Sequence, residues 1–427
     1  MAYPLQPEQE NGGEKAAELP RSLPSEAELA MRRYFREKVA SRAEGRLWPI
    51  RVLPPLMKQT LLHAKAVRQE TGQSPWQLLR DCYATCLREE SWPAGYYRYR
   101  LYRPERRHLA GRFIDERVGF PLLMKLNDPE DVAVLDDKLQ FAAACARLGL
   151  PHVEVLAYFE NGDLAQAAIN GPEDLPRDDL FVKSTSLRSG WGVQRWAYDP
   201  ASQTYRHAGQ RLTAGELLRA IGKLSLGEQE EGSAPKRLPF WKRWFSNEKQ
   251  QEGGDARPYI VQRSMRNHAL MAPFTNGALC TVRIVTARPK GGEPQVIVAS
   301  LRMPTGGSVV DNFVAGGLAS PIDLETGQLG PAVYMDPRRP DRDVHPDTGQ
   351  PIADAVLPFW KEVRELSLRA HRAFPRIATV GWDIAITDDG VRLLEANTGW
   401  GFHVVQMAQG KPLGTTALPE MLMSHAV

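Results

Sequence analysis

Two carboxylates and one amide lie in the segment GWDIAITDDGVRLLEANTGWG, residues 381–401. Alternating apolar runs on both sides of Asp-Asp-Gly predict a β-hairpin whose three-residue loop carries glycine in the left-handed conformation. In that register Asp383 faces Glu395 across the hairpin, and Asn397 lies on the same face, opposite Gly381. The register instead slips by one residue if Asp-Gly alone forms the turn.

The three side chains Asp383, Glu395 and Asn397 make an all-oxygen group that suits a hard divalent cation. Facing side chains across an antiparallel pair lie about 4.5–5.5 Å apart at Cβ. The two carboxylates therefore either raise each other's pKa or need a cation. Mg²⁺ held by few carboxylates completes its shell with water and substrate phosphate, so the pattern predicts Mg²⁺ together with a nucleotide. The alternative is a solvated polar face on an edge hairpin.

A lysine and a loop of small polar residues lie in LFVKSTSLRSGWGVQRW, residues 180–196. Lys183 ends an apolar strand, and the loop after it offers backbone N–H and hydroxyl groups that can bind phosphate. The loop lacks the G-K-[ST] sequence of a Walker P-loop and is followed by a strand. A plain hairpin loop is the alternative. The candidate phosphate ligands in this loop are Ser184, Ser186, Ser189 and Gly190.

A further cation, Arg283, lies among β-branched residues in the run CTVRIVT. An unpaired charge inside such a strand is costly, and the run holds no other charge. Arg283 therefore either pairs with a carboxylate from elsewhere in the chain or contacts a transferred phosphoryl group.

Composition excludes several classes of protein. The 427 residues carry a net charge of +3 and no aromatic-plus-basic RNA signature, so no nucleic-acid partner is expected. The four scattered cysteines suit a reducing cytoplasm. The chain begins with a polar segment rather than a signal peptide, and no apolar run reaches the roughly 18 residues that a membrane span needs. We expect a cytoplasmic protein of two or three domains.

Helical spacing dominates the first third of the chain, and strand patterns dominate the rest. Residues 1–24 are polar and expected to be disordered, whereas 25–128 form a helical region with a break at Gly72–Ser74. The Tyr- and Arg-rich segment 92–113 is predicted to be a connection with solvated arginines, or alternatively a surface for an anionic substrate. A helix is predicted over 131–148. The strands predicted between this helix and the hairpin include HVEVLAYF, DLFVKS, GVQRWAYD, PYIVQRSM, CTVRIVTAR and QVIVASLRM.

Residues 227–257 are poor in core-forming side chains and are predicted to be an inserted loop. Its centre, residues 236–245, interleaves four basic side chains with four aromatic ones. Such a composition is typical of weak contact with an anionic membrane surface. The alternatives are a mobile insertion that packs its aromatics on its own domain, or a lid over a nucleotide.

In this order, the features resemble the ATP-grasp superfamily, and most nearly its family associated with sugar transfer, which is related to α-L-glutamate ligases. The resemblance covers residues 95–415 and is carried by DDKLQFAAACARLGLP, FVKSTSLRSGWGV, YIVQRSMRNH, TVRIVT, DNFVAGGLASPID and WDIAITDDGVRLLEANTGWG. It implies an α+β ATP-grasp fold, in which two α+β subdomains clasp ATP. The implied small subdomain is 129–265, with the insertion, and the large one is 266–427. The helical region before them does not resemble the α/β domain that usually precedes an ATP-grasp core.

The resemblance also implies nucleotide contacts. Lys138 and Lys183 resemble the two lysines that contact the nucleotide phosphates. Residues 261–263, with Gln262 and Arg263, lie where the adenine hinge is expected, although Gln262 occupies a place where an acidic residue is frequent. His268 follows this hinge, and it either reaches ribose or phosphate or lies on the surface.

The catalytic groups follow from the same resemblance. Arg283 is similar to the arginine that steadies an acyl phosphate, with Lys183 beside it. Asn312 and Gly317 resemble the loop near the transferred phosphate. The residues that resemble the Mg²⁺ ligands are Asp383, Glu395 and Asn397.

The implied reaction is ATP-dependent: a carboxylate is phosphorylated, and an amine attacks the acyl phosphate to give an amide, ADP and phosphate. Small-molecule or lipid-linked substrates of cell-envelope polysaccharide or peptide modification are expected from the resemblance. One alternative is a kinase that phosphorylates a hydroxyl, which needs a general base near the acceptor. The other is a nucleotide-binding regulatory protein without turnover.

Overall fold

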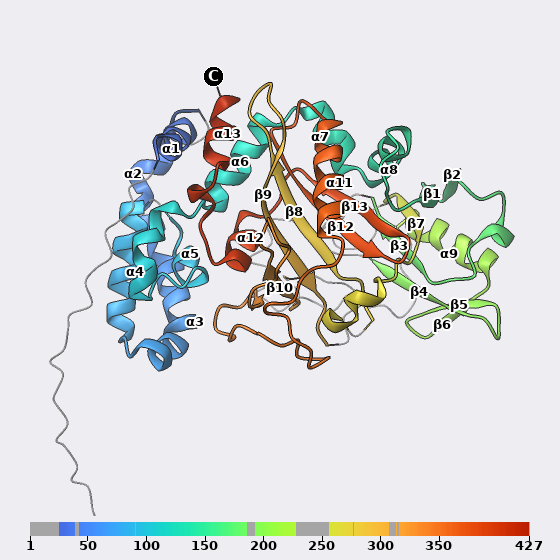
Figure 1. Cartoon of the computed structure of the whole chain (residues 1–427), viewed down its shortest axis with the longest axis horizontal. Coiled ribbons are helices and arrows are strands. Elements are labelled where there is room, and N and C mark those ends of the chain that lie inside the picture. The colour runs from blue at the N-terminus through green and yellow to red at the C-terminus, as the bar shows by residue number, and fades with distance from the viewer. Residues whose placement is uncertain are drawn as a thin grey trace, which may run out of the picture.

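The computed structural model describes residues 25–38, 42–89, 91–185, 193–227, 256–275, 277–306, 313 and 316–426 (Figure 1). Several predicted features lie outside these residues. They are the tail 1–24, most of the loop 227–257 with its centre 236–245, and the site candidates Ser186, Ser189, Gly190 and Asn312. Within the described part, no helix is both long enough and apolar enough to cross a membrane.

Helices form the first third of the chain, as predicted. They are α1 (Glu26–Lys38), α2 (Arg42–Arg51), α3 (Leu53–Thr71), α4 (Pro75–Glu89), α5 (Pro93–Arg98), the 3₁₀ helix η1 (Pro104–Arg112) and α6 (Glu116–Leu126). Gly72 ends α3 in the left-handed conformation with φ 72°, where glycine has no Cβ to clash. Ser74 then starts α4, because its hydroxyl accepts the Gln77 N–H at 3.3 Å while the Gln77 side chain accepts the Ser74 N–H at 2.8 Å. The predicted break is confirmed.

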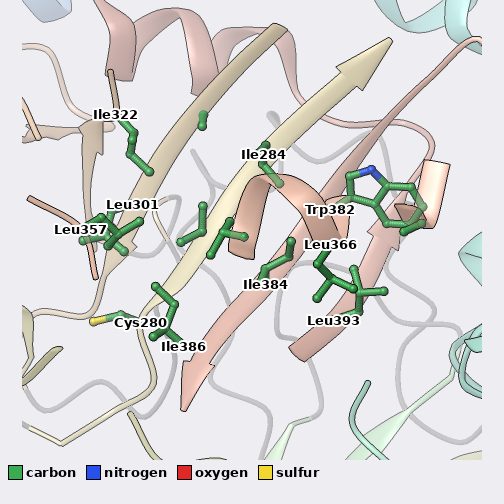
Figure 2. Close-up of a cluster of buried hydrophobic side chains, with 14 of the residues drawn as sticks. Cys280, Ile284, Leu301, Ile322, Leu357, Leu366, Trp382, Ile384, Ile386 and Leu393 are labelled. Atoms are coloured by element: carbon green, nitrogen blue, oxygen red, sulfur yellow. The ribbon is translucent and has the colours of Figure 1, made fainter. Parts of the chain in front are cut away.

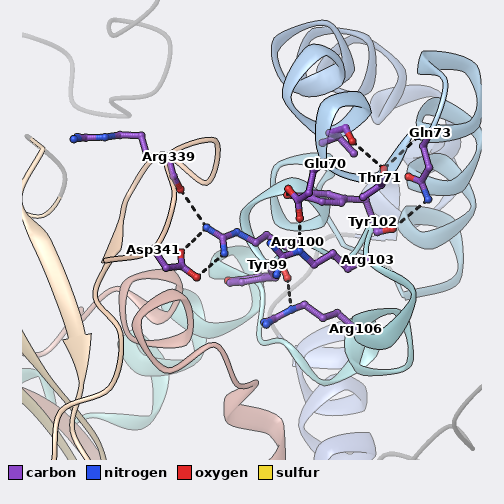
Figure 3. Close-up of polar contacts among 11 residues, drawn as sticks. Glu70, Thr71, Gln73, Tyr99, Arg100, Tyr102, Arg103, Arg106, Arg339 and Asp341 are labelled. Atoms are coloured by element: carbon purple, nitrogen blue, oxygen red, sulfur yellow. Dashed lines mark hydrogen bonds and ion pairs between the residues drawn. The ribbon is translucent and has the colours of Figure 1, made fainter. Parts of the chain in front are cut away.

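The Tyr- and Arg-rich segment 92–113 connects this helical region to the rest of the molecule (Figure 3). Arg100 forms a two-pronged ion pair with Asp341, at 2.6 and 2.8 Å. Arg106 donates a 2.7 Å hydrogen bond to the carbonyl of Gly410, which lies in the carboxyl-terminal part of the chain. The segment is therefore a connection, as expected, but the expectation that its arginines are solvated is wrong for Arg100 and Arg106.

One sheet has seven short strands in the order β2-β1-β7-β3-β4-β5-β6, and all its pairings are antiparallel. It is called here the smaller sheet, because its strands contain fewer residues in total than those of the second sheet. Leu180, Val182 and Val261 on its central strands form one apolar cluster with Leu217 and Ile221 of α9. This sheet carries the segment that holds Lys183. Its strands are β1 (Val155–Glu160), β2 (Asp163–Ala167), β3 (Leu180–Ser184), β4 (Gln194–Asp199), β5 (Thr204–His207), β6 (Gln210–Leu212) and β7 (Tyr259–Arg263), with η2 (Pro172–Asp174) and α9 (Ala214–Ser225).

A larger sheet has six antiparallel strands in the order β11-β10-β9-β8-β12-β13. One face packs against α11 through Ile284, Trp382, Ile384 and Leu366 (Figure 2). Its strands are β8 (Thr281–Ala287), β9 (Gln295–Met303), β10 (Leu318–Pro321), β11 (Val333–Tyr334), β12 (Thr379–Thr387) and β13 (Gly390–Asn397). The other elements here are η3 (Ala269–Phe274), α11 (Trp360–Arg372), α12 (Phe402–Gln409), η5 (Leu413–Thr415) and α13 (Leu418–Ser424). The fold is thus α+β, as predicted.

The opposite face of the larger sheet is shared between a core and a polar surface. Val285 and Ala287 of β8 pack in a second apolar cluster with Phe402 and Val405 of α12. Side chains alternate along a strand, so Arg283, two residues before Val285 in β8, projects from this same face. α12 thus covers the part of this face around Val285 and Ala287, whereas the part around Arg283 borders a cavity.

The predicted helix 131–148 is interrupted. The structure has α7 (Pro129–Asp136) and α8 (Lys138–Arg147), separated by Asp137. The Asp137 carboxylate accepts the N–H groups of Leu139 and Gln140 at 3.0 and 2.8 Å, which starts a new helix. Lys138 therefore occupies the first position of α8 instead of a position inside a longer helix.

Candidate functional site

A cavity of about 490 Å³ lies between the two sheets. The smaller sheet contributes Lys183, Gln262 and Arg263 to its lining, and α8 contributes Lys138. Strands of the larger sheet supply a charged wall formed by Thr281, Arg283, Arg302, Asp383, Glu395 and Asn397. Most of the predicted site residues that the structure describes therefore meet at one place, although they come from segments far apart in the sequence.

The wall is built on the pairing of three neighbouring strands. Arg283 of β8 pairs with Asp383 of β12, and Asp383 pairs with Glu395 of β13. Asn397 pairs with Gly381, so the predicted register holds at these positions. A Cβ placed on Gly381 would lie 2.8 Å from the Cβ of Trp400 and 3.4 Å from the Arg283 side chain. The small residue therefore allows the tryptophan to pack beside the charged row.

The hairpin turn differs from the prediction. A β-bulge between Asp383 and Ile384 shifts the register, and Thr387 then pairs with Gly390. The loop consequently has two residues instead of three, with Gly390 at φ 97° beside it. The extra residue in β13 at the bulge keeps the polar side chains facing the cavity.

Asp383 is held by two guanidinium groups. Arg283 donates to its two carboxylate oxygens at 2.5 and 2.9 Å, and Arg302 approaches at 3.1 Å. The Asn397 side-chain amide donates to the same carboxylate at 3.3 Å. Burial alone would raise the pKa of Asp383, but Arg283 and Arg302 lower it to about 2. Arg283 was expected either to pair with a carboxylate or to contact a transferred phosphoryl group, and the structure contains the ion pair, with Asp383.

Glu395 is paired with the other sheet. Lys183 of β3 reaches across the cavity, and its Nζ lies 3.1 Å from Glu395 Oε1. Burial raises the pKa of Glu395, but Lys183 and Lys138 outweigh burial and lower the pKa below its usual value. The nearby carboxylate of Asp383 also raises the pKa of Glu395, as expected for two facing carboxylates, but the side-chain cations of the protein itself outweigh this effect. Four cations interact with two carboxylates here, Lys138, Lys183, Arg283 and Arg302 against Asp383 and Glu395.

The ion pair of Asp383 makes stability depend on pH in the acid range. An aspartate has a pKa of about 3.9 in an unfolded chain, so the lowered pKa of about 2 in the folded protein stabilises the fold above that range. This contribution, about 2–3 kcal/mol, is lost as the pH falls towards 2. We expect the free energy of unfolding of the wild type to exceed that of Asp383→Asn at pH 6, and the difference to shrink by about pH 2–3. Urea titrations across this range measure it; a difference independent of pH would contradict the assignment.

The other side of the cavity is more apolar. Gln262 is buried on β7 and donates a 3.3 Å hydrogen bond to the Val153 carbonyl. Phe181, which pairs with Gln262 between β3 and β7, and Met265 also line the cavity. A flat heterocycle fits such a mixture of apolar walls and a few backbone and amide groups.

Three predicted residues lie elsewhere. Ser184 is buried in the pairing of β3 with β7, and Gly317 precedes β10. His268 accepts the Leu270 N–H at 3.1 Å and packs edge-on against Phe359. None of Ser184, His268 and Gly317 is among the described residues that line the cavity.

Sequence reasoning missed two groups that line the cavity. Arg302 is a cation in the otherwise apolar strand β9, and its guanidinium donates to Thr281 Oγ1 at 2.6 Å as well as pairing with Asp383. The pattern that singled out Arg283 could have found it, since QVIVASLRM also contains a single charge.

The second group is a pair formed by Glu116 and His403, at the first turns of α6 and α12. Glu116 Oε1 accepts the backbone N–H of His403 at 2.8 Å and also contacts His403 Nδ1 closely. Burial and the nearby Arg98 lower the pKa of His403, against the opposing effect of Glu116. Burial raises the pKa of Glu116, but the hydrogen bonds from His403 bring it below its usual value. Both side chains line the cavity, so a neutral imidazole with an oriented ring is available there.

The suitability of the wall for a divalent metal follows from its donor set. Asp383, Glu395 and Asn397 offer two carboxylates and one amide on a single sheet face, which suits Mg²⁺ with few protein ligands. Among the described residues, no group of three or more His, Cys, Asp or Glu side chains is arranged to hold a metal ion by itself. The donor set fits a metal whose remaining ligands are water and phosphate.

Comparisons with solved structures give low similarity. The chain is similar to the D-Ala:D-Ser ligase VanG from Enterococcus faecalis, at 12% identity over 70% of this chain and 64% of that one, with a TM-score of 0.39. It is also similar to the D-alanine–D-alanine ligase from Coxiella burnetii, at 14% identity over 72% of this chain and 66% of that one, with a TM-score of 0.37. A third similar structure is N5-carboxyaminoimidazole ribonucleotide synthetase from Thermotoga maritima, at 10% identity over 67% of this chain and 49% of that one, with a TM-score of 0.29. The chain thus spans less than two thirds of the length of each.

Comparison with protein families identifies a family model that matches one long stretch of the chain. The comparison with curated proteins gives no match. Residues 120–418 match the family described as sugar-transfer associated ATP-grasp. This range contains both sheets, α8 and the whole charged wall of the cavity. Because the match extends over well over half of the chain, the protein belongs to the sugar-transfer associated ATP-grasp family.

Proposed function

We propose that this protein is an ATP-dependent carboxylate–amine ligase that forms an amide through an acyl phosphate. The observation that carries the proposal is the row Arg283–Asp383–Glu395 on one wall of the cavity, which Lys183 reaches from the opposite sheet. The arrangement offers cations for phosphate, and carboxylates for a metal, within one cavity.

ATP is proposed to lie between the sheets. Lys138 and Lys183 bind its phosphates, because both lysines line the cavity beside Glu395 and an ammonium group forms charge-assisted hydrogen bonds with phosphate. Gln262 and Arg263 bind the adenine end, where Phe181 and Met265 supply apolar contact. Ser186, Ser189, Gly190 and Asn312 remain candidates for phosphate contacts from outside the described residues.

Asp383, Glu395 and Asn397 are proposed to hold Mg²⁺, which when bound neutralises phosphate charge. The ion pairs of Asp383 and Glu395 with arginine and lysine rearrange in this proposal. With a nucleotide bound, the cations would donate to the phosphate oxygens, and the carboxylates of Asp383 and Glu395 would then be available to hold the metal. Both carboxylates are ready for this, since their lowered pKa values keep them ionised at neutral pH.

The chemical step in this proposal depends on positioning and on electrostatics. Arg283 and Arg302 face the place where charge develops on the transferred phosphoryl group and on the acyl oxygen. Nucleophilic attack by an amine forms the C–N bond, breaks the C–O bond of the acyl phosphate and releases phosphate. His403 accepts the proton of the amine, because Glu116 holds its Nδ1 and leaves Nε2 for the substrate.

The same pair supports a second candidate function. A kinase needs a general base near the hydroxyl that it phosphorylates, and His403 with Glu116 offers one on the cavity wall. The ligase is preferred because Arg283 and Arg302 together suit an acyl phosphate, which carries charge on both the carbonyl and the phosphoryl oxygens.

The biological setting is also a proposal. It comprises a cytoplasmic location and a role in modifying cell-envelope polysaccharide or peptide, with a small-molecule or lipid-linked substrate. The family description supports a connection with sugar transfer. Contact of residues 236–245 with an anionic membrane belongs to this proposal, and it is tested together with the membrane experiment below.

ADP release tests the proposed function. The full chain is incubated with ATP and Mg²⁺ and with panels of amino acids and acidic sugars, with and without an added amine. The proposal expects at least one carboxylate to raise ADP release well above the rate without substrate. A regulatory protein would bind ATP and release ADP at that background rate with every panel.

Lys183→Ala is expected to weaken ATP binding more than it slows turnover at saturating ATP. A charge-assisted hydrogen bond contributes about 1.5–3 kcal/mol, so the dissociation constant for ATP should rise by roughly tenfold or more. Calorimetric titration with ATP measures it. Lys361→Ala is the matched control, because this lysine on α11 is 85% exposed and is not among the described residues that line the cavity; an equal effect of both changes would contradict the role of Lys183.

A further inference from the structure

Six large apolar side chains are exposed on α2 and the first half of α3. Their exposed fractions lie between 42% and 77%, and the highest belongs to Leu61. The set, called here the 47–62 stripe, consists of Leu47, Ile50, Leu53, Met57, Leu61 and Leu62. A soluble surface seldom gathers so many exposed apolar side chains in one short stretch of chain, and such a patch marks an interaction site.

The stripe is separate from the face by which α3 packs on the protein. Leu53, Met57 and Leu61 follow one another at intervals of four residues, so they share one face of the helix. Leu56 and Val67 lie on another face and are buried in the core cluster of the helical region. α3 is therefore apolar on two faces, and only one of them stabilises the fold.

The charges within residues 47–69, the part of the sequence that holds the stripe, have one sign, and the first acidic residue after it is Glu70. From residue 47 to residue 69 the sequence contains Arg51, Lys58, Lys65 and Arg68 and no aspartate or glutamate. Arg51, Lys65 and Arg68 are exposed. Lys65 and Arg68 follow Leu61 by about one and two turns of α3, so cations lie at the end of the apolar stripe.

We propose that the 47–62 stripe and its flanking basic residues form a docking surface for an anionic lipid membrane. A helix with an apolar face and basic flanks lies in the plane of a bilayer, its apolar side chains at the boundary between headgroups and acyl chains. Lysine and arginine reach the lipid phosphates with their charged ends while their stems stay in apolar contact. A purely apolar protein partner would not require a flank free of acidic residues, whereas an anionic surface does.

The position of the stripe in the fold is compatible with docking. α2 and α3 lie at one end of the long axis of the molecule, and the smaller sheet lies at the other end (Figure 1). A membrane bound at α2 and α3 therefore leaves the smaller sheet, with Lys183, in solution. This inference is independent of the reaction that the cavity performs.

Co-sedimentation of the full chain with lipid vesicles tests the proposal. Vesicles contain either phosphatidylcholine alone or phosphatidylcholine with about one third phosphatidylglycerol, at low and high salt. We expect binding to the anionic vesicles that weakens with salt and little binding to the neutral ones. The double variant Met57→Glu/Leu61→Glu should lower the partition coefficient by at least about tenfold, and Lys65→Gln/Arg68→Gln should reduce mainly its salt dependence.

Controls keep the outcomes distinct. Val356→Glu introduces the same charge at an apolar side chain that is 62% exposed but outside the stripe, and it should bind as the wild type does. Thermal midpoints check that each variant folds. A variant that lacks residues 236–245 shows whether that segment causes the vesicle binding. The proposal is overturned if this deletion variant loses vesicle binding while Met57→Glu/Leu61→Glu keeps it. It is also overturned if the wild type stays in the supernatant, or if sedimentation equilibrium shows a dimer that the double variant dissociates while vesicle binding is absent.

Discussion

Replacement of Glu395 by glutamine is expected to reduce ATP turnover by at least about a hundredfold, the effect of removing a group that stabilises charge in the transition state. The change keeps the shape of the side chain but removes one of the two carboxylates on the charged wall and the partner of Lys183. ADP release at saturating ATP and Mg²⁺ measures the loss. Asp383→Asn should cause a similar loss, accompanied by lower stability because its two arginine partners lose their counter-charge.

Asp389→Asn is the matched control for these changes. Asp389 lies on the same hairpin, but its side chain is 78% exposed and its nearest cation, Arg392, is 3.9 Å away. We expect this variant to keep wild-type turnover. The proposed metal site is refuted if Glu395→Gln and Asp383→Asn both fold and both keep wild-type turnover.

Arg283→Ala should lower turnover by a hundredfold or more, in the range reported for removing a transition-state donor, while ATP affinity changes much less. The reason is that Arg283 faces developing charge, so its contribution is larger in the transition state than in the ground state. Arg283→Lys should recover only part of the rate, since lysine keeps the charge but lacks the planar fork that grips Asp383 at two oxygens.

Single-turnover rates and ATP titrations separate the two effects. Arg392→Ala on β13 serves as the control, because this arginine belongs to the same sheet but does not line the described cavity. If Arg283→Ala loses affinity and rate in the same proportion as Lys183→Ala does, the proposed division between binding and chemistry is wrong.

The cross-strand pairing of Asp383 with Glu395 could be predicted from the sequence, because the alternation of apolar and polar residues along the two strands determines it. Asp383 and Glu395 lie in runs whose apolar residues must face a core, and this fixes which side chains share a face. The turn could not be predicted in the same way. A bulge next to Asp383 absorbs one residue, so a correct register at the site coexists with a two-residue loop.

A charged residue inside an apolar strand predicts a site residue, whereas the start of a helix is harder to predict from the sequence. Arg302 carries the same signal as Arg283 and could have been predicted from it. Lys138 was placed inside one long helix, because Asp137 is equally compatible with a helix interior and with a cap. Only the structure shows that its carboxylate accepts two backbone N–H groups there.

Contacts between distant segments left no local pattern. Glu116 and His403 are separated by 287 residues, and each is an ordinary polar residue at the beginning of its helix. The ion pair of Lys183 with Glu395 depends on how the two sheets face each other. Such pairings follow from the packing of whole subdomains, which no window of the sequence describes.

Trapping with hydroxylamine tests the central claim most directly. The wild-type protein is incubated with ATP, Mg²⁺, hydroxylamine and a carboxylate that raises ADP release, and hydroxamate and ADP are quantified together. The account predicts hydroxamate in amounts that match ADP, because hydroxylamine replaces the amine in attack on an acyl phosphate, and neither product above background with Glu395→Gln. ADP formed without hydroxamate would contradict the account and favour phosphorylation of a hydroxyl.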